Sequence, residues 1–236
     1  MAAVTRTGTA EAAMYGQGAG GGTALLRLLN LTSPALPIGG FHFSQGLEDA
    51  VERGLVHDAA STGDWIGGLA EHALGTLDLP LLLRLHSAWT DRSSARVWRL
   101  SARLIASRET AELRAEDRHL GSALARVLIE HGINDAKPWV SHVDASHAAL
   151  FALAAARWDI CAADAATGYL WSWCENQVLA AIKLIPLGQS AGQRLLGQLI
   201  QRIPEIVETA AGIDDEDIGI ASPMQGIEIG RASCRE

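Results

Sequence analysis

Histidines are the residues of this chain best suited to bind a metal or transfer a proton, and the sequence contains eight of them. Their spacing does not match a metal site. His142 and His147 are five residues apart, whereas two ligands share one helix face at spacings of about three or four. Glu71 and His72 are adjacent, so they do not make the Glu-x-x-His pair of helical di-metal sites. We therefore expect surface or helix-end histidines and no metal site.

Asp117 is the carboxylate that most needs an explanation. It lies in line with Leu113 and Leu120 on the apolar stripe of an expected helix. A carboxylate in that position needs a partner or a protein interface. Either it pairs with a nearby Arg at the helix edge, or it forms a buried site with His86 or His119. The second arrangement would make the protein a helical enzyme or a small-molecule-binding protein.

Common nucleotide-binding and catalytic motifs are missing from the sequence. There is no GxxxxGK[ST] loop, no GxGxxG after a strand, no GxSxG and no HExxH. The three cysteines, Cys161, Cys174 and Cys234, form no CxxC pair. These common motifs therefore supply no candidate catalytic or nucleotide-binding residue.

The elements that would position these residues are helices. Hydrophobic residues make up 48% of the 236-residue chain and aromatic residues only 5%. Ala and Leu dominate and favour helices, whereas a sheet protein would favour Val, Ile, Tyr and Thr. We predict an all-α fold, a single-domain bundle of about nine helices over residues 23–227.

Breaks in the helical pattern set the expected boundaries. Residues 1–22 have no apolar period and are expected to form a disordered leader, after which Thr23 begins the first helix. We expect Ser44 to cap the second helix, Ser61 to start the third and Pro80 to lie in the first turn of the fourth. One or two helices should follow over 93–131, then a helix from Asp144 or Ser146 through Trp158 and another over 161–185. The last helix should follow Pro186 and Gly188 and end near Gly212.

The helix expected over 161–185 has a narrow polar face beside a broad apolar one. Asn176 and Lys183 lie on the polar face. Such a stripe is usually the solvated side of a helix. Gln177 falls among the apolar residues instead, so it would need buried hydrogen-bond partners.

Charge and hydropathy exclude two classes of partner. The formal net charge is −8 and no run of Lys or Arg makes a basic stripe, so nucleic acid is excluded as a partner. No apolar stretch approaches the roughly 20 residues that span a bilayer. The N-terminus lacks the basic-then-apolar order of a signal peptide, and we expect a cytoplasmic protein.

Two motifs together resemble those of a known family. The first covers residues 33–48 (SPALPIGGFHFSQGLE) and the second covers residues 175–193 (ENQVLAAIKLIPLGQSAGQ). With residues 108–114 (RETAELR) and Gly121 between them, they resemble the UreF urease accessory family. The similarity runs from about Leu25 to Ile227.

The resemblance implies an all-α protein that dimerises and performs no catalysis. It implies a complex with a UreD/UreH-type accessory protein and with the GTPase UreG, which engages apo-urease and delivers nickel. A family member would couple nucleotide hydrolysis on the GTPase to nickel insertion. It would hold no nucleotide and no tightly bound cofactor itself.

The resemblance also suggests roles for individual residues. The expected partner-contact residues are Glu48, Asn176, Lys183, Gln189 and Gln193. Lys183 would offer a positive charge to the acidic edge of a GTPase, or it is a solvated lysine. The residues expected to shape the turns of the two motifs are Pro37, Gly39, Gly40, Ser44, Gly46, Pro186 and Gly188.

The C-terminal residues depart from the family pattern. Residues 229–236 (IGRASCRE) are the translation of a common sequencing adapter. We expect residues 228–236 to be an assembly artefact outside the fold. The tail of family members contacts the UreD/UreH-type partner, so we expect this chain to bind that partner less well.

Overall fold

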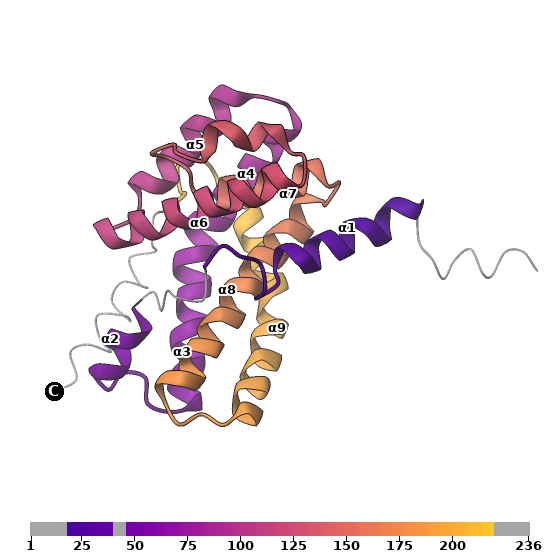
Figure 1. Ribbon diagram of the computed structural model, residues 1–236. Helices are drawn as coiled ribbons and strands as arrows, with labels where there is room; N and C mark the ends of the chain where they lie inside the picture. Colours follow the sequence, from indigo (N-terminus) through magenta and orange to yellow (C-terminus); the bar gives the residue numbers. More distant parts are fainter. Residues whose placement is uncertain (1–17, 40–45, 220–236) are drawn as a thin grey trace, which may run out of the picture.

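The computed structural model describes residues 18–39 and 46–219, and these ranges are helical without any strand (Figure 1). The all-α prediction is confirmed. A π-helical segment (Ala70–Asp78) follows the third helix, and a 3-10 segment (Asn134–Trp139) follows the sixth. The nine α-helices of the described ranges are α1 (Gly18–Leu31), α2 (Leu47–Glu52), α3 (Ala59–Leu69), α4 (Leu79–Thr90), α5 (Ser94–Ala106), α6 (Ala111–Glu130), α7 (His147–Arg157), α8 (Ala162–Leu184) and α9 (Gln189–Ala211).

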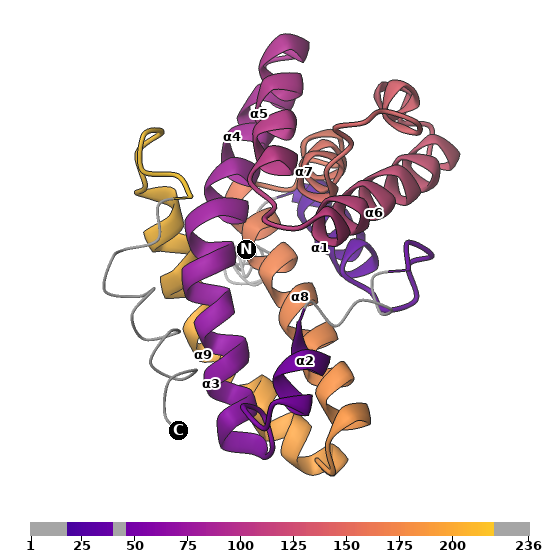
Figure 2. The ribbon, with the colours of Figure 1, turned by 90° about the vertical axis from the view of Figure 1, so that its left-hand side faces the viewer.

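Helix α7 is the most deeply buried element of the core. Every residue from Ala148 to Ala155 is buried, as expected for a helix that is apolar all round. It packs against α4, α6 and α8, and α8 in turn lies along α9 (Figures 1 and 2). No helix within the described ranges is long and apolar enough to cross a bilayer.

The chain passes from α3 through the π-helical segment into α4 without a break. Pro80 lies in the first turn of α4, as predicted, although helical residues precede it. Because proline has no N–H, the carbonyl of Thr76 loses its usual α-helical partner. The N–H of Gly219 donates to this carbonyl at 2.9 Å. The segment after α9 is therefore bound to the junction of the π-helical segment and α4.

Helix α1 projects from the body of the molecule (Figure 1). It begins at Gly18, so the structure places the helix start earlier than Thr23 and within the segment expected to be disordered. Once a helix is nucleated, extension by one residue adds one hydrogen bond, which offsets the cost of about 1 kcal/mol for each Gly relative to Ala. Residues 1–17 lie outside the described ranges.

Side-chain caps determine several helix starts. Asp58, rather than Ser61, caps α3, because its carboxylate accepts the Ser61 N–H at 2.8 Å and the two residues form a capping box. Ser146 caps α7 and so decides between the two starts left open. The predicted cap Ser44 lies outside the described residues, and Gly46 directly precedes α2.

Breaks between the later helices follow the prediction more closely. Residues 93–131 form two helices, α5 and α6, rather than one. Pro186 and Gly188 lie in the link between α8 and α9, as predicted. Helix α9 contains Pro204 and ends at Ala211, beside the expected Gly212.

Candidate functional site

A cavity of about 200 Å³ lies between the loop after α1, the π-helical segment, α6 and α8. Leu36 and Ile38 of the loop and Leu113 of α6 give it apolar walls, and Asn176 and Gln177 of α8 give it polar ones. An engineered cavity of about 150 Å³ admits a benzene molecule. The cavity therefore has room for one group of side-chain size.

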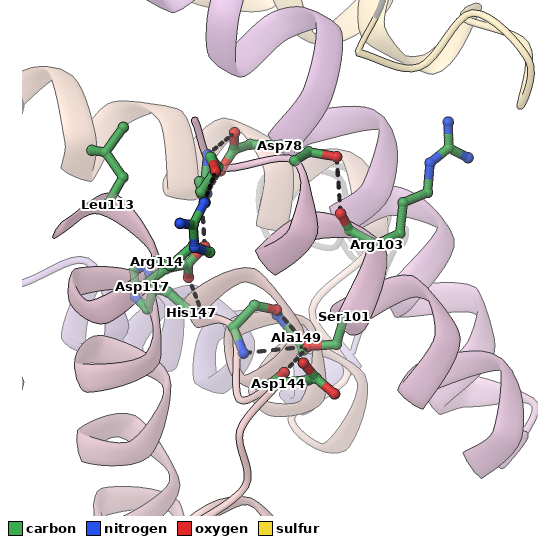
Figure 3. A network of polar contacts seen from close by, with 12 residues as sticks. Asp78, Ser101, Arg103, Leu113, Arg114, Asp117, Asp144, His147 and Ala149 are labelled. Atoms are coloured by element: carbon green, nitrogen blue, oxygen red, sulfur yellow. Dashed lines mark hydrogen bonds and ion pairs between the residues drawn. The ribbon is translucent and has the colours of Figure 1, made fainter. Parts of the chain in front are cut away.

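Asp78, Arg108 and Asp117 form an ion network in the wall of this cavity. Figure 3 shows where Asp78, Asp117 and His147 lie among the polar contacts. The two terminal nitrogens of Arg108 donate to the two carboxylate oxygens of Asp78 at 2.9 and 2.5 Å, and its Nε–H donates to Asp117 at 2.9 Å. Burial opposes the charge on Arg108, but the two carboxylates outweigh it and hold its pKa well above the usual value. One guanidinium thus joins the last residue of the π-helical segment to α6. Such π-helical turns are frequent at functional sites.

His147 and Tyr169 complete the network on the side of α7 and α8. The other Asp117 oxygen accepts the backbone N–H of His147 at 2.6 Å, and the Tyr169 hydroxyl donates to Asp78 at 3.3 Å. Burial lowers the pKa of His147 to about 4, against the opposing effect of the two carboxylates. Burial, reinforced by Asp78, raises the pKa of Tyr169 well above its usual value. Both rings are therefore neutral near pH 7.

The structure decides between the two interpretations of Asp117. The carboxylate pairs with Arg108, so the pairing with an Arg is confirmed. The Nε2 of His86 instead lies 2.9 Å from the carbonyl oxygen of Ile160. Both carboxylate oxygens of Asp117 thus have a donor, the Arg108 guanidinium and the backbone N–H of His147.

Comparison with known proteins establishes the family. A sequence model of the UreF family matches residues 56–200. The urease accessory protein UreF of Alkalilimnicola ehrlichii is 48% identical over 202 residues, which cover 86% of this chain and 89% of that protein. The chain belongs to the UreF family. Two further relatives have similar identity. The UreF protein of Hahella chejuensis is 45% identical over 200 residues, which cover 85% of this chain and 90% of that protein. The UreF protein of Azoarcus sp. strain BH72 is 44% identical over 218 residues, which cover 90% of this chain and 93% of that protein.

Most of the residues expected to contact partners are exposed in this UreF chain. Glu48 lies on α2, Lys183 near the end of α8, and Gln189 and Gln193 in the first turns of α9. Helix α2 packs on α8 and α8 packs on α9, so these residues belong to elements that meet at one end of the bundle (Figure 2). Asn176 is half-buried instead and lines the cavity.

The glycines of the first motif have the backbone shape that was expected. Gly39 and Gly46 have φ of 77° and 88°, a region that favours glycine because it has no Cβ. Gly188 differs, because its φ is −64° and the space where a Cβ would be is open. Its backbone therefore does not require glycine. Gly40 and Ser44 lie outside the described residues.

The described histidines and cysteines are not arranged as a metal site, and several of them pack in the fold. Among the described residues, no three His, Cys, Asp or Glu side chains are grouped so that they could hold a metal ion. The ring of His142 lies 4.2 Å from that of Trp98, and His131 meets Trp158 edge-on. Burial raises the pKa of the Cys174 thiol to about 12, so it does not supply a thiolate near pH 7.

Sequence reasoning missed four members of the network: Asp78, Arg108, His147 and Tyr169. The RETAELR stretch at residues 108–114 belonged to the family resemblance, but no role followed for Arg108. Gln177 was expected to need buried partners. Its Oε1 is buried and has no hydrogen-bond partner within the described ranges.

Proposed function

We propose that this chain is a non-catalytic urease maturation protein that bridges a UreD/UreH-type accessory protein and the UreG GTPase. It acts as a homodimer in the cytoplasm and promotes GTP-dependent insertion of nickel into apo-urease. Nickel is the cargo of the complex rather than a resident cofactor of this chain. The observation that carries the proposal is the extent of the similarity, since three proteins named UreF match 85–90% of this chain at 44–48% identity.

The surface where α2, α8 and α9 meet supports a contact role. Glu48, Lys183, Gln189 and Gln193 place polar and charged groups there, all of them exposed. Polar and charged groups at an interface speed the association of two proteins and set their relative orientation. The buried Asp/His enzyme has less support, because Asp117 pairs with Arg108 and the cavity of about 200 Å³ is smaller than most small-molecule sites, about 300–1,000 Å³.

The test is co-elution on a size-exclusion column. The purified chain is mixed with cognate UreD/UreH-type protein, with the GTPase, and with both. The mixtures are repeated with a chain in which a family-like tail replaces residues 228–236. A stable complex with either version supports the proposal, and binding only with the replaced tail assigns the defect to those residues.

A second readout follows function directly. Apo-urease is incubated with nickel, GTP and the accessory proteins, with or without this chain, and urease activity and bound nickel are measured. The proposal expects both quantities to increase when this chain is present. If neither version of the chain co-elutes with any partner and neither raises urease activity, the proposal is wrong.

A further inference from the structure

Gln177 has a buried acceptor that the described part of the chain leaves unused. The residue is only 1% exposed, it lines the cavity, and its Oε1 has no hydrogen-bond partner among residues 18–39 and 46–219. A buried acceptor without a donor costs free energy, so such groups are rare unless something else satisfies them. The cavity therefore offers a free acceptor to a hydrogen-bond donor.

The charges around the cavity indicate the sign of its occupant. Asp78 and Asp117 carry two carboxylates, and the one guanidinium of Arg108 pairs with both of them. His147 adds no charge near pH 7, because burial lowers its pKa to about 4. Asp78, Asp117 and Arg108 thus have one net negative charge together, and Glu116 is a further acidic residue in the cavity lining. Uncompensated charge is costly inside a protein, so a cation is favoured there.

The walls of the cavity indicate the shape of the occupant. Leu36, Ile38 and Leu113 line it and are each half-buried, so apolar surface extends from the cavity towards solvent. Lysine and arginine side chains lay an aliphatic stem along such a surface and place their charged end among polar groups. The volume of about 200 Å³ suits one side chain better than a larger small molecule.

We propose that the cavity receives one lysine or arginine side chain of a partner protein. Its charged end donates a hydrogen bond to Gln177 Oε1 and lies near the Asp78 and Asp117 carboxylates, while its stem packs against Leu36 and Ile38. The inference rests on the proposed function for the existence of a partner. The chemistry of the cavity does not depend on that function.

The first experiment tests the chemistry with small probes. The ¹⁵N-labelled full chain is titrated by NMR with N-acetyl-arginine methylamide and N-acetyl-lysine methylamide, and with the neutral citrulline analogue as control. A cationic probe should bind roughly tenfold or more tightly than citrulline, as expected for a charge-assisted hydrogen bond. Equal binding of the charged and neutral probes would overturn the proposal.

Variants at Gln177 locate the binding. Gln177→Leu removes the acceptor and should weaken binding of the cationic probe roughly tenfold. Gln177→Glu adds a negative charge and should strengthen it, which keeps the test decisive if the leucine variant fails to fold. Gln198→Leu is the matched control, because Gln198 is exposed on α9 and away from the cavity lining. If the Gln177 and Gln198 variants bind the probes alike, the cavity is not the site.

The last step tests the source of the cation. Complex formation with the UreD/UreH-type protein and the GTPase is compared for the unmodified chain, Gln177→Leu and Gln198→Leu. Weaker assembly of the Gln177 variant alone, and competition by excess arginine probe, support a partner side chain. If the probe binds but assembly is unchanged, the cavity takes a free cation and the proposed occupant is wrong. If the unmodified chain forms no complex, the proposed function and the occupant both fail, while the titration still decides the chemistry.

Discussion

The Arg108 guanidinium binds both carboxylate oxygens of Asp78, a residue 30 positions earlier in the chain. The two distances are 2.9 and 2.5 Å, and the carboxylate is only 3% exposed. A two-point contact of this kind fixes orientation as well as distance. Because the same guanidinium also binds Asp117, it holds the π-helical segment and α6 in the positions that form the cavity.

Removing Arg108 should destabilise the protein strongly. Arg108→Met leaves two buried carboxylates without their cation, and the free energy of unfolding should fall by about 3–5 kcal/mol. Urea denaturation followed by circular dichroism measures this change. Arg53→Met is the control, because the Arg53–Asp49 pair is 68% and 60% exposed and its loss should change stability by less than about 1 kcal/mol. If Arg108→Met lowers the free energy of unfolding as little as Arg53→Met does, the buried network does not stabilise the fold.

Stability should fall in mild acid because of His147. Burial lowers the pKa of this residue in the folded protein from 6.5 to about 4, so between these values the unfolded chain binds more protons than the folded one. The free energy of unfolding therefore rises with pH across this window, and acidification from pH 6.5 to 4 should remove up to about 3 kcal/mol. Urea denaturation at several pH values gives the slope.

Substitution separates this contribution from that of other titrating groups. His147→Phe keeps an aromatic ring beside Phe151 and Tyr169 and should flatten the pH dependence between pH 6.5 and 4. His57→Phe, at a site where the side chain is 67% exposed, should keep the slope of the unmodified protein. A slope that is unchanged in the His147 variant would contradict the assignment.

Gly121, the one glycine of α6, should tolerate substitution poorly. A Cβ at this position would lie 2.2 Å from the carbonyl oxygen of Ala145, so α6 and the start of α7 would have to separate. Gly121→Ala should lower the free energy of unfolding by about 1–3 kcal/mol or more. Gly197→Ala on α9 is the matched control, because nothing lies within 4 Å of its added Cβ, and alanine should stabilise that helix by about 0.5–1 kcal/mol. Thermal unfolding should show a lower melting temperature for Gly121→Ala and a higher one for Gly197→Ala than for the unmodified protein.

Local patterns predicted the elements, whereas the network depends on distant contacts. Pro80 in a first turn and the break at Pro186 follow from the chemistry of proline and a few neighbours. The ion network could not be assigned in this way, because Arg108 meets Asp78 only after α5 has folded back along α4. The sequence indicated that Asp117 needed a partner, but it did not indicate which arginine. The π-helical turn that ends at Asp78 has no equivalent signal in the apolar spacing.

Lys183 and Lys137, the two lysines of the chain, allow a matched test of the proposed partner surface. Both are exposed, but Lys183 lies near the end of α8, whereas Lys137 lies in the 3-10 segment between α6 and α7. If Lys183 faces the acidic edge of the GTPase, Lys183→Glu should raise the dissociation constant of the complex between this chain and the GTPase about five- to tenfold. The increase should come mainly from slower association. Lys137→Glu makes the same change of charge and should leave binding unchanged. Biolayer interferometry at low and high salt tests both variants, and the effect at Lys183 should shrink as salt screens the charges. Equal effects of the two variants would mean that net charge, rather than a contact at Lys183, governs the association.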